Sequence, residues 1–179
     1  MSDGIQHHLG LVDSIEAEAV GVPGQRTFNI TVKNGHGEAV VWMEKEQLFQ
    51  VGISIKQFIA SRESTADPAP FSPDAPPPEQ PVSLEFKTGE MSLRHDAASD
   101  VFTLTAQDSG AEDDDPGHEP VEVHFSFTRT EAEALADSAL EVVASGRQPC
   151  PLCGGPMNAG GEHFCVKKNG HNRGAATFE

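Results

Sequence analysis

The sequence predicts an α+β fold: a mostly antiparallel sheet made of two halves, each with strands followed by a helix, and both helices on one face. Apolar residues alternate along several short stretches, which indicates strands, and recur every three or four positions in two longer stretches, which indicates helices. A cluster of cysteines near the C-terminus indicates a zinc-knuckle tail. We therefore assign residues 1–146 to the α+β domain and residues 147–179 to the zinc-binding tail.

The first half contains three predicted strands. Alternating apolar residues mark them at Leu11–Val20, Thr27–Lys33 and Glu38–Met43. Asn34-Gly35 predicts a hairpin between the second and third strands, because a type I′ turn needs positive φ at both central residues. After the third strand the apolar period lengthens to three and four residues, which predicts a helix. The positions on its apolar face are Leu48, Val51, Ile55, Phe58 and Ile59.

The second half follows a proline-rich segment, residues 67–81, which we expect to be a linker or surface loop because proline is excluded from helix interiors and central strands. Four further strands are predicted at Val82–Phe86, Glu90–Leu93, Val101–Ala106 and Val121–Phe127. Thr128 and Glu131 have the spacing of a capping box and predict the start of the second helix. Its expected core-facing positions are Leu135, Ala139, Leu140 and Val143. Gly146 is expected to end it.

The composition is acidic. Of the 179 residues, 28 are Asp or Glu and 12 are Lys or Arg, so the formal net charge is −16, which disfavours nucleic-acid or anionic-membrane binding by the surface as a whole. The acidic stretch 108–117 predicts a solvated loop, since it lacks the alternating ligand spacing of a calcium loop. No apolar run approaches the roughly 20 residues of a membrane span. The start of the chain lacks the features of a signal peptide, so we expect a cytoplasmic protein.

The three cysteines predict a metal site. Cys150, Cys153 and Cys165 lie within sixteen residues of one another, and their odd number argues against a disulfide framework. Cys150 and Cys153 flank a short turn rich in Pro and Gly, so both sulfurs can point at one ion. His163 lies two positions before Cys165, which places both on one side of an extended chain. Because Zn²⁺ accepts three thiolates and one imidazole in tetrahedral geometry, we predict a zinc site on Cys150, Cys153, His163 and Cys165.

Two alternatives to this site stay open. Cys150 and Cys153 could form a redox pair, although the Gly-Gly-Pro that follows would break the helix that lowers a thiol pKa in such pairs. His171 could replace His163 as the fourth ligand, since it lies a short loop beyond Cys165. With either His163 or His171 as the fourth ligand, the four protein ligands leave no open position for water. The zinc is therefore expected to be structural.

Several strings resemble a bacterial family of unknown function, catalogued as conserved repeat proteins of about this length with a C-terminal CxxC…HxC tail. The strings are residues 21–28, 44–47, 150–154, 161–165 and 169–170. The resemblance covers nearly the whole chain and implies no activity. It favours His163 over His171, because a histidine two residues before the last cysteine is the family pattern. The chain departs from that pattern at Val166, where the family usually has proline, and in longer proline-rich and acidic loops.

The function we expect is that of a non-enzymatic interaction or adaptor protein with a structural zinc site and a protein partner. Lys167, Lys168 and Arg173 give the tail a basic patch suited to an anionic partner, or they are solvated charges. The alternative is a nucleic-acid-binding zinc ribbon that uses the same basic residues. The net charge and the scarcity of aromatic residues near them oppose that alternative.

An enzyme of hydrolase or transferase type is a further alternative that we disfavour. The candidate groups are Arg26, Glu44, Glu46, His95 and His124. Arg26 and Glu44 are expected to form a buried pair at the junction of sheet and helix. Alternation places His124 on the polar face of its strand, where we expect it to be solvent-exposed. His7 and His8, near the N-terminus, are expected to be disordered.

Overall fold

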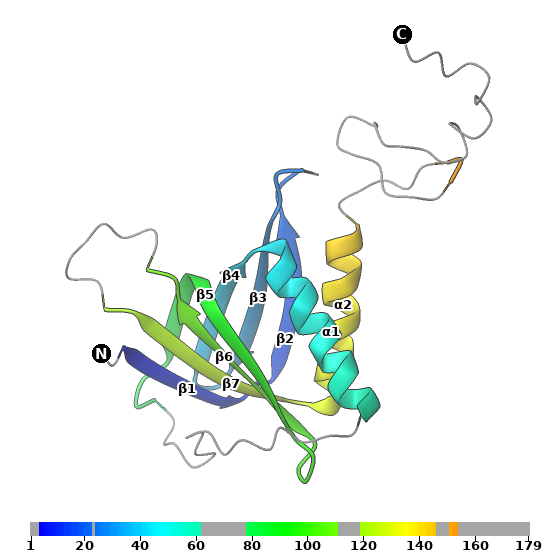
Figure 1. The fold of residues 1–179 in the computed structure, drawn as a ribbon. Helices are drawn as coiled ribbons and strands as arrows, with labels where there is room; N and C mark the ends of the chain where they lie inside the picture. The colour runs from blue at the N-terminus through cyan, green and yellow to red at the C-terminus, as the bar shows by residue number, and fades with distance from the viewer. Residues whose placement is uncertain (1–3, 23, 62–77, 111–118, 146–150, 154–179) are drawn as a thin grey trace, which may run out of the picture.

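The computed structural model describes residues 4–22, 24–61, 78–110, 119–145 and 151–153. Within them the chain forms a seven-stranded mixed sheet and two helices (Figure 1). The strands are β1 (Ile5–Leu11), β2 (Ser14–Val20), β3 (Thr27–Asn34), β4 (Gly37–Met43), β5 (Val82–Asp96), β6 (Val101–Asp108) and β7 (Val121–Thr128). The helices are α1 (Lys45–Ser61), which follows β4, and α2 (Arg129–Ala144), which follows β7.

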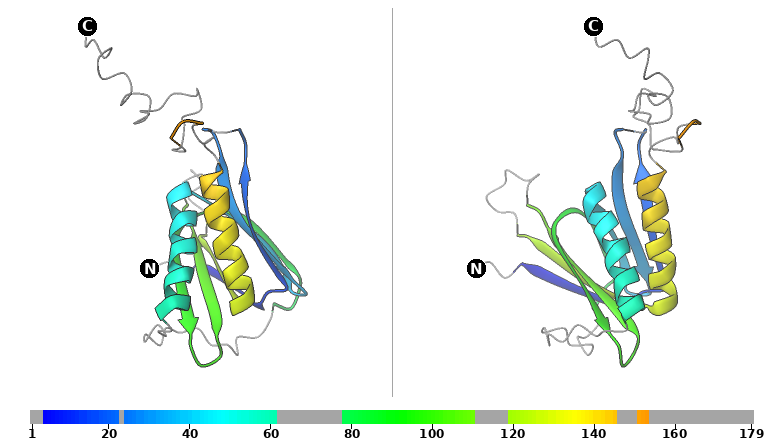
Figure 2. Two further views of the ribbon diagram at one scale, coloured as in Figure 1. Left: turned by 90° about the vertical axis from the view of Figure 1, so that its right-hand side faces the viewer. Right: turned by 45° about the vertical axis from the view of Figure 1, so that its right-hand side comes forward.

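The predicted α+β class is confirmed. The strand order is β1-β7-β6-β5-β4-β3-β2, in which β1–β7 and β4–β5 are parallel and the other neighbouring pairs are antiparallel. Strands followed by a helix occur twice along the chain, and both helices lie on the same face of the sheet (Figure 2). The parallel pairing of β4 with β5 follows from α1, because a helical crossover returns the chain in its original direction.

A two-residue corner, Val12-Asp13, connects β1 to β2, the two edge strands of the sheet. The two strands are consecutive in the chain but stand at opposite ends of the strand order. At the corner, the Val12 amide donates to the Ser126 carbonyl of β7 at 2.8 Å, and the Asp13 amide donates to the Lys33 carbonyl of β3 at 2.9 Å. The strand predicted at Leu11–Val20 was therefore placed too early, because Leu11 ends β1 and β2 begins at Ser14.

The predicted hairpin between β3 and β4 is confirmed, but its turn lies one residue later than expected and is not of type I′, because neither Gly35 nor His36 has a positive φ. Asn34 pairs with Gly37 in the ladder, so the loop is Gly35-His36. The Asn34 side chain donates from Nδ2 to the carbonyls of Leu9 (2.6 Å) and Leu11 (3.0 Å), and its Oδ1 accepts from the His36 amide (2.9 Å). Asn34 therefore joins the hairpin to β1 rather than occupying the turn.

The two strands predicted at Val82–Phe86 and Glu90–Leu93 form one long strand, β5. Its pairing register with β6 shifts between Thr88 and Glu90, as at a β-bulge. The buried Thr88 hydroxyl lies 2.9 Å from the carbonyls of both Glu90 and Gln107 and fixes the irregularity. The apparent break in the sequence pattern is therefore a bulge within a continuous strand.

The helices pack on the sheet through the faces that the sequence predicts. In α1 the buried residues include Leu48, Val51 and Ile55, while Phe58 and Ile59 are partly buried. Gly52 lets the helices approach closely, because a Cβ at this position would lie 3.1 Å from Cγ of Leu140 in α2. The described core is one apolar cluster that includes β-strand residues and both helices.

The predicted capping box at the start of α2 is confirmed. The Glu131 carboxylate accepts from the Thr128 amide at 2.8 Å, while the Thr128 hydroxyl accepts from the Glu131 amide. Leu135 and Ala139 are fully buried in the core, and Leu140 and Val143 are partly buried. The helix ends at Ala144 with Ser145 as its C-cap; the predicted end, Gly146, lies outside the described residues.

Candidate functional site

The predicted zinc ligands lie mostly outside the described residues. Cys153 is described, in a turn at residues 151–153, whereas Cys150, His163 and Cys165 are not; nor is His171, the alternative fourth ligand. Within the described ranges, no three His, Cys, Asp or Glu side chains converge in a way that could hold a metal ion. The zinc site therefore stays a prediction from the sequence.

The expected pair between Arg26 and Glu44 is wrong. Arg26 donates from Nη1 to the hydroxyl of Ser145 at 3.3 Å and so ties the start of β3 to the end of α2. Glu44 instead forms an ion pair with Lys87, with 2.8 Å between Oε1 and Nζ. The sequence placed both residues near the junction of sheet and helix, but their partners come from the second half of the chain and could not be predicted locally.

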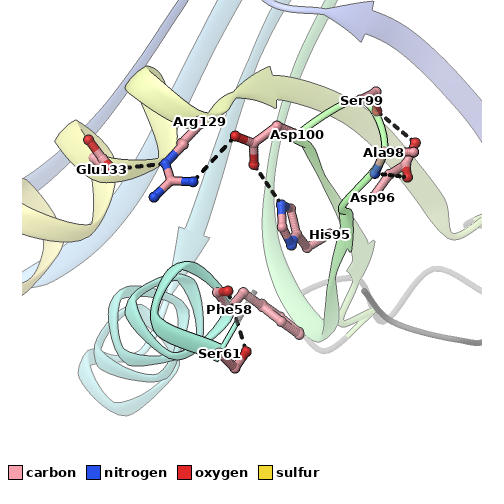
Figure 3. A network of polar contacts seen from close by, with 9 residues as sticks. All are labelled: Phe58, Ser61, His95, Asp96, Ala98, Ser99, Asp100, Arg129 and Glu133. Carbon is pink, nitrogen blue, oxygen red and sulfur yellow. Dashed lines mark hydrogen bonds and ion pairs between the residues drawn. The ribbon is translucent and has the colours of Figure 1, made fainter. Parts of the chain in front are cut away.

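His95 belongs to a polar network between the β5–β6 turn and α2 (Figure 3). Its Nε2 lies 2.9 Å from Oδ1 of Asp100, and Nη1 of Arg129 lies 3.4 Å from the other carboxylate oxygen. Arg129 also pairs through Nε with Glu133, one helical turn later, at 3.1 Å. The hydrogen bond from His95 and then the contact with Arg129 lower the pKa of Asp100.

The surroundings of His95 indicate a structural role. A carboxylate bonded to an imidazole can orient a general base, but such a base must also reach a substrate. The His95 side chain is only 4% exposed, and its ring is stacked on Phe102 with 4.3 Å between the centroids. Asp100 has a φ of +55°, so the contacts with His95 and Arg129 hold a strained backbone at the turn. The network locks this turn onto the first turn of α2.

His124 forms a second cluster on the opposite face of the sheet from the core. Its Nε2 lies 2.6 Å from Oε1 of Glu122 and its Nδ1 lies 3.0 Å from the hydroxyl of Thr105 in β6. The His8 ring of β1 is stacked on the His124 ring, with 4.5 Å between centroids and 16° between planes. Burial lowers the pKa of His8, and the nearby His124 lowers it further.

The structure corrects two predictions about these histidines. His124 faces away from the core as predicted, but its side chain is only 14% exposed because β1 covers one side of it. His7 and His8 are not disordered; they lie in β1, in parallel register with Val123 and His124. The sequence signal for β1 is weak, because three consecutive polar residues, Gln6, His7 and His8, interrupt the apolar alternation between Ile5 and Leu9.

An open groove of about 420 Å³ lies between the first half of α1 and the middle of β5. Its apolar lining residues are Val51, Met91, Leu93 and Leu104. Its other lining residues, polar apart from Gly89, are Glu46, Gln47, Gln50, Ser54, Gly89, Glu90 and Ser92. Of the five residues that the sequence offered as candidate catalytic groups, Glu46 is the one that lines this groove. The groove itself could not be predicted, because it depends on how α1 sits over the bulge in β5.

The family of this protein follows from its sequence. Residues 7–165 match the family described as "Protein of unknown function (DUF3090)". The chain belongs to this family. The DUF3090 match begins in β1, spans the sheet and both helices, and includes the four predicted zinc ligands but not His171. No curated protein and no solved structure matches the chain. Among the described helices, none is both long and apolar enough to cross a membrane.

Proposed function

We propose that this DUF3090 protein is a non-enzymatic interaction protein of the cytoplasm whose C-terminal tail is held by one structural zinc ion. The observation that carries the proposal is the clustering of all three cysteines with a histidine in the order Cys150, Cys153, His163, Cys165. In a reducing compartment this pattern is typical of a metal site rather than of disulfides. The ligands fill a tetrahedral shell and leave no position for a reacting water.

The non-enzymatic part of the proposal is supported by how the histidines of the described residues are used. His95 is stacked in the core beside Asp100, and His124 is held by Glu122 and Thr105 beneath β1. Each ring therefore joins two segments of the fold. Catalysis would need such a group to reach a substrate. The His95 and His124 side chains are instead only 4% and 14% exposed.

The end of α2, which precedes the tail in the chain, supports an interaction role. Ser145, the C-cap of this helix, accepts a hydrogen bond from Arg26, so the end of α2 is tied to the start of β3. Zinc would order the following segment without a large apolar core, since structural zinc contributes on the order of 10–16 kcal/mol in small peptides. Lys167 and Lys168 would then be presented at a defined place on an otherwise acidic protein, where a protein partner could recognise them.

Metal analysis of the purified full chain tests the proposal. We expect close to one zinc per chain, and we expect Cys153→Ser to abolish it and to expose the chain after residue 146 to proteolysis while the sheet stays folded. Native mass spectrometry and limited proteolysis measure both effects. A wild-type protein without zinc, or with an open coordination position, contradicts the proposal.

A matched pair of variants identifies the fourth ligand. His163→Ala should reduce zinc retention under chelator far more than His171→Ala, because His163 lies at the family position beside Cys165. The two variants remove the same side chain from the same tail, so a general effect on the tail would weaken zinc equally. The opposite ranking would assign His171 as the ligand.

A further inference from the structure

We propose that the groove between α1 and β5 binds a basic, amphipathic segment of a protein partner, in which apolar side chains alternate with lysine or arginine. This inference rests on the proposed interaction function and names the surface and the chemistry of the partner. The apolar lining consists of Val51 from α1 and of Met91, Leu93 and Leu104 from the sheet. Met91 and Leu93 are only half-buried, so apolar surface remains to be covered.

The groove is preformed. Gln47 of α1 donates from Nε2 to the Gly89 carbonyl at 3.1 Å, and its Oε1 accepts from the Glu44 amide at 2.8 Å. The bulge opposite the helix is fixed by the two contacts of the Thr88 hydroxyl. Because helix and bulge are tied together before a ligand arrives, binding costs little ordering of the protein. Gly89, at the bulge, therefore forms part of one wall of the groove.

The charge of the groove selects a cation. Glu46 and Glu90 both line it and are exposed, and neither forms an ion pair with any residue that the structure describes. Glu44 differs, since Lys87 neutralises it. No basic side chain lines the groove. The register with β6 places the Glu90 side chain on the face of the sheet opposite Met91, so the carboxylate beside the apolar floor is that of Glu46. This carboxylate favours lysine or arginine in the ligand, and the net charge of −16 attracts such a ligand from a distance.

The shape of the groove favours a chain segment over a small molecule. Its volume of about 420 Å³ is near the lower end of ligand sites, which span roughly 300–1,000 Å³. It is open to solvent rather than enclosed, so it would cover one side of a peptide and leave the other in water. Met91 adds an adaptable surface, because its unbranched side chain can adjust to different apolar partners.

Fluorescence anisotropy with the full-length protein tests this proposal. The probe is a fluorescein-labelled ten-residue peptide of alternating leucine and lysine. Two comparison peptides replace every lysine by glutamate or every leucine by serine. We expect the leucine–lysine peptide to bind, the serine–lysine peptide to bind at least about tenfold more weakly, and the leucine–glutamate peptide not to bind. Equal binding of the first two peptides would overturn the proposal, because the apolar floor would then play no part.

Two pairs of variants locate the binding. Glu46→Gln should weaken binding about twofold to fivefold at low salt, as expected for the loss of one exposed ion pair. The control, Glu16→Gln on edge strand β2, makes the same change in net charge away from the groove and should alter binding less than about 1.5-fold. Equal weakening by both variants would overturn the proposal, since only the overall charge would then matter.

The second pair fills the groove without changing charge. Ser54→Phe introduces a ring among the lining residues and should weaken binding at least about tenfold, whereas Gln57→Phe, at an exposed position of α1 that does not line the groove, should not. Gln50→Phe is the second groove variant, used where circular dichroism shows that Ser54→Phe fails to fold. Unchanged binding in a folded groove variant would overturn the proposal.

Zinc measured on the same samples separates this inference from the proposed function. If the full-length protein carries one zinc per chain but does not bind the leucine–lysine peptide, the groove is rejected as the docking surface and the proposed function is retained. Groove binding by a protein without zinc would support the groove and reject the structural zinc.

Discussion

His8 shows how one side chain links protonation to the fold. Its ring is stacked on His124, and the titratable groups that act on it are His124, Glu122 and its neighbour His7. Burial is the main cause of its lowered pKa, and burial also lowers the pKa of His7. Because the folded pKa lies below the ordinary value of 6.5, the unfolded chain takes up its proton at higher pH. The contribution of neutral His8 to the free energy of unfolding is therefore fully present above pH 6.5, and it is lost as the pH falls toward the folded pKa.

The first prediction concerns His8→Gln. The wild-type protein should lose stability as the pH falls from about 7.5 to 5.5, and the variant should lose less over the same range, because glutamine takes up no proton. Urea unfolding followed by the fluorescence of Trp42, the single tryptophan, measures both slopes. His36→Gln, in the exposed turn before β4, is the control and should keep the wild-type slope. Identical slopes for wild type and His8→Gln would exclude this coupling.

At the scale of elements, strand β1 depends on contacts from distant parts of the chain. It pairs with β7 on one side and is held at its C-terminal end by Asn34, whose side chain bonds to the carbonyls of Leu9 and Leu11. The same side chain accepts from the His36 amide. One asparagine thereby fixes both the β3–β4 turn and the corner at which β1 turns into β2.

The second prediction is that Asn34→Ala destabilises the protein by about 1–3 kcal/mol, since three hydrogen bonds are lost and the partly buried carbonyl of Leu9 loses a donor. Urea unfolding gives the loss, and amide hydrogen exchange should show the largest increase in β1. Lys33→Ala is the control, because it removes only an exposed ion pair with Glu38 and should cost less than about 1 kcal/mol. Unchanged exchange in β1 would show that Asn34 does not hold this strand.

Sequence reasoning predicted the elements that are specified locally. The capping box of Thr128 and the apolar face of α1 depend on residues within one or two helical turns, and both are confirmed. Strand β1 was missed because its pairing partner, β7, lies more than a hundred residues later. The bulge at Thr88 was interpreted as a break between two strands, since alternation alone does not distinguish a bulge from a loop.

The candidate site divides in the same way. The zinc ligands form a local spacing pattern, so the sequence alone predicts them, and they remain a prediction. The groove combines one face of α1 with the bulge of β5, and Gln47 and Gly89, which join its walls, are far apart in the chain. The partners of Arg26 and Glu44 were likewise set by tertiary packing. The sequence therefore indicated which residues are candidate ligands or partners, but it could not predict which distant residues meet to form a surface.

At the scale of the whole molecule, the core that the structure describes precedes the predicted tail. Its buried apolar cluster runs from Leu9 to Ala139, and the partly buried residues that pack on it extend to Val143. The helix cap at Ser145 and its bond to Arg26 complete this arrangement. The proposed boundary at residue 146 therefore falls after every described contribution to the core, and the tail would be an addition to a domain that folds without it.

The last prediction is that a chain ending at Gly146 folds cooperatively, with a thermal midpoint within about 4 °C of the full-length protein, because the described core loses no side chain. Circular dichroism melting measures the midpoint, and Leu135→Ala in the same truncated chain should cost about 2–5 kcal/mol, which shows that the assay detects a core defect. The full-length protein with a zinc chelator should retain the same transition. A truncated chain without a cooperative transition would mean that residues 147–179 belong to the core and that zinc stabilises the whole fold rather than the tail.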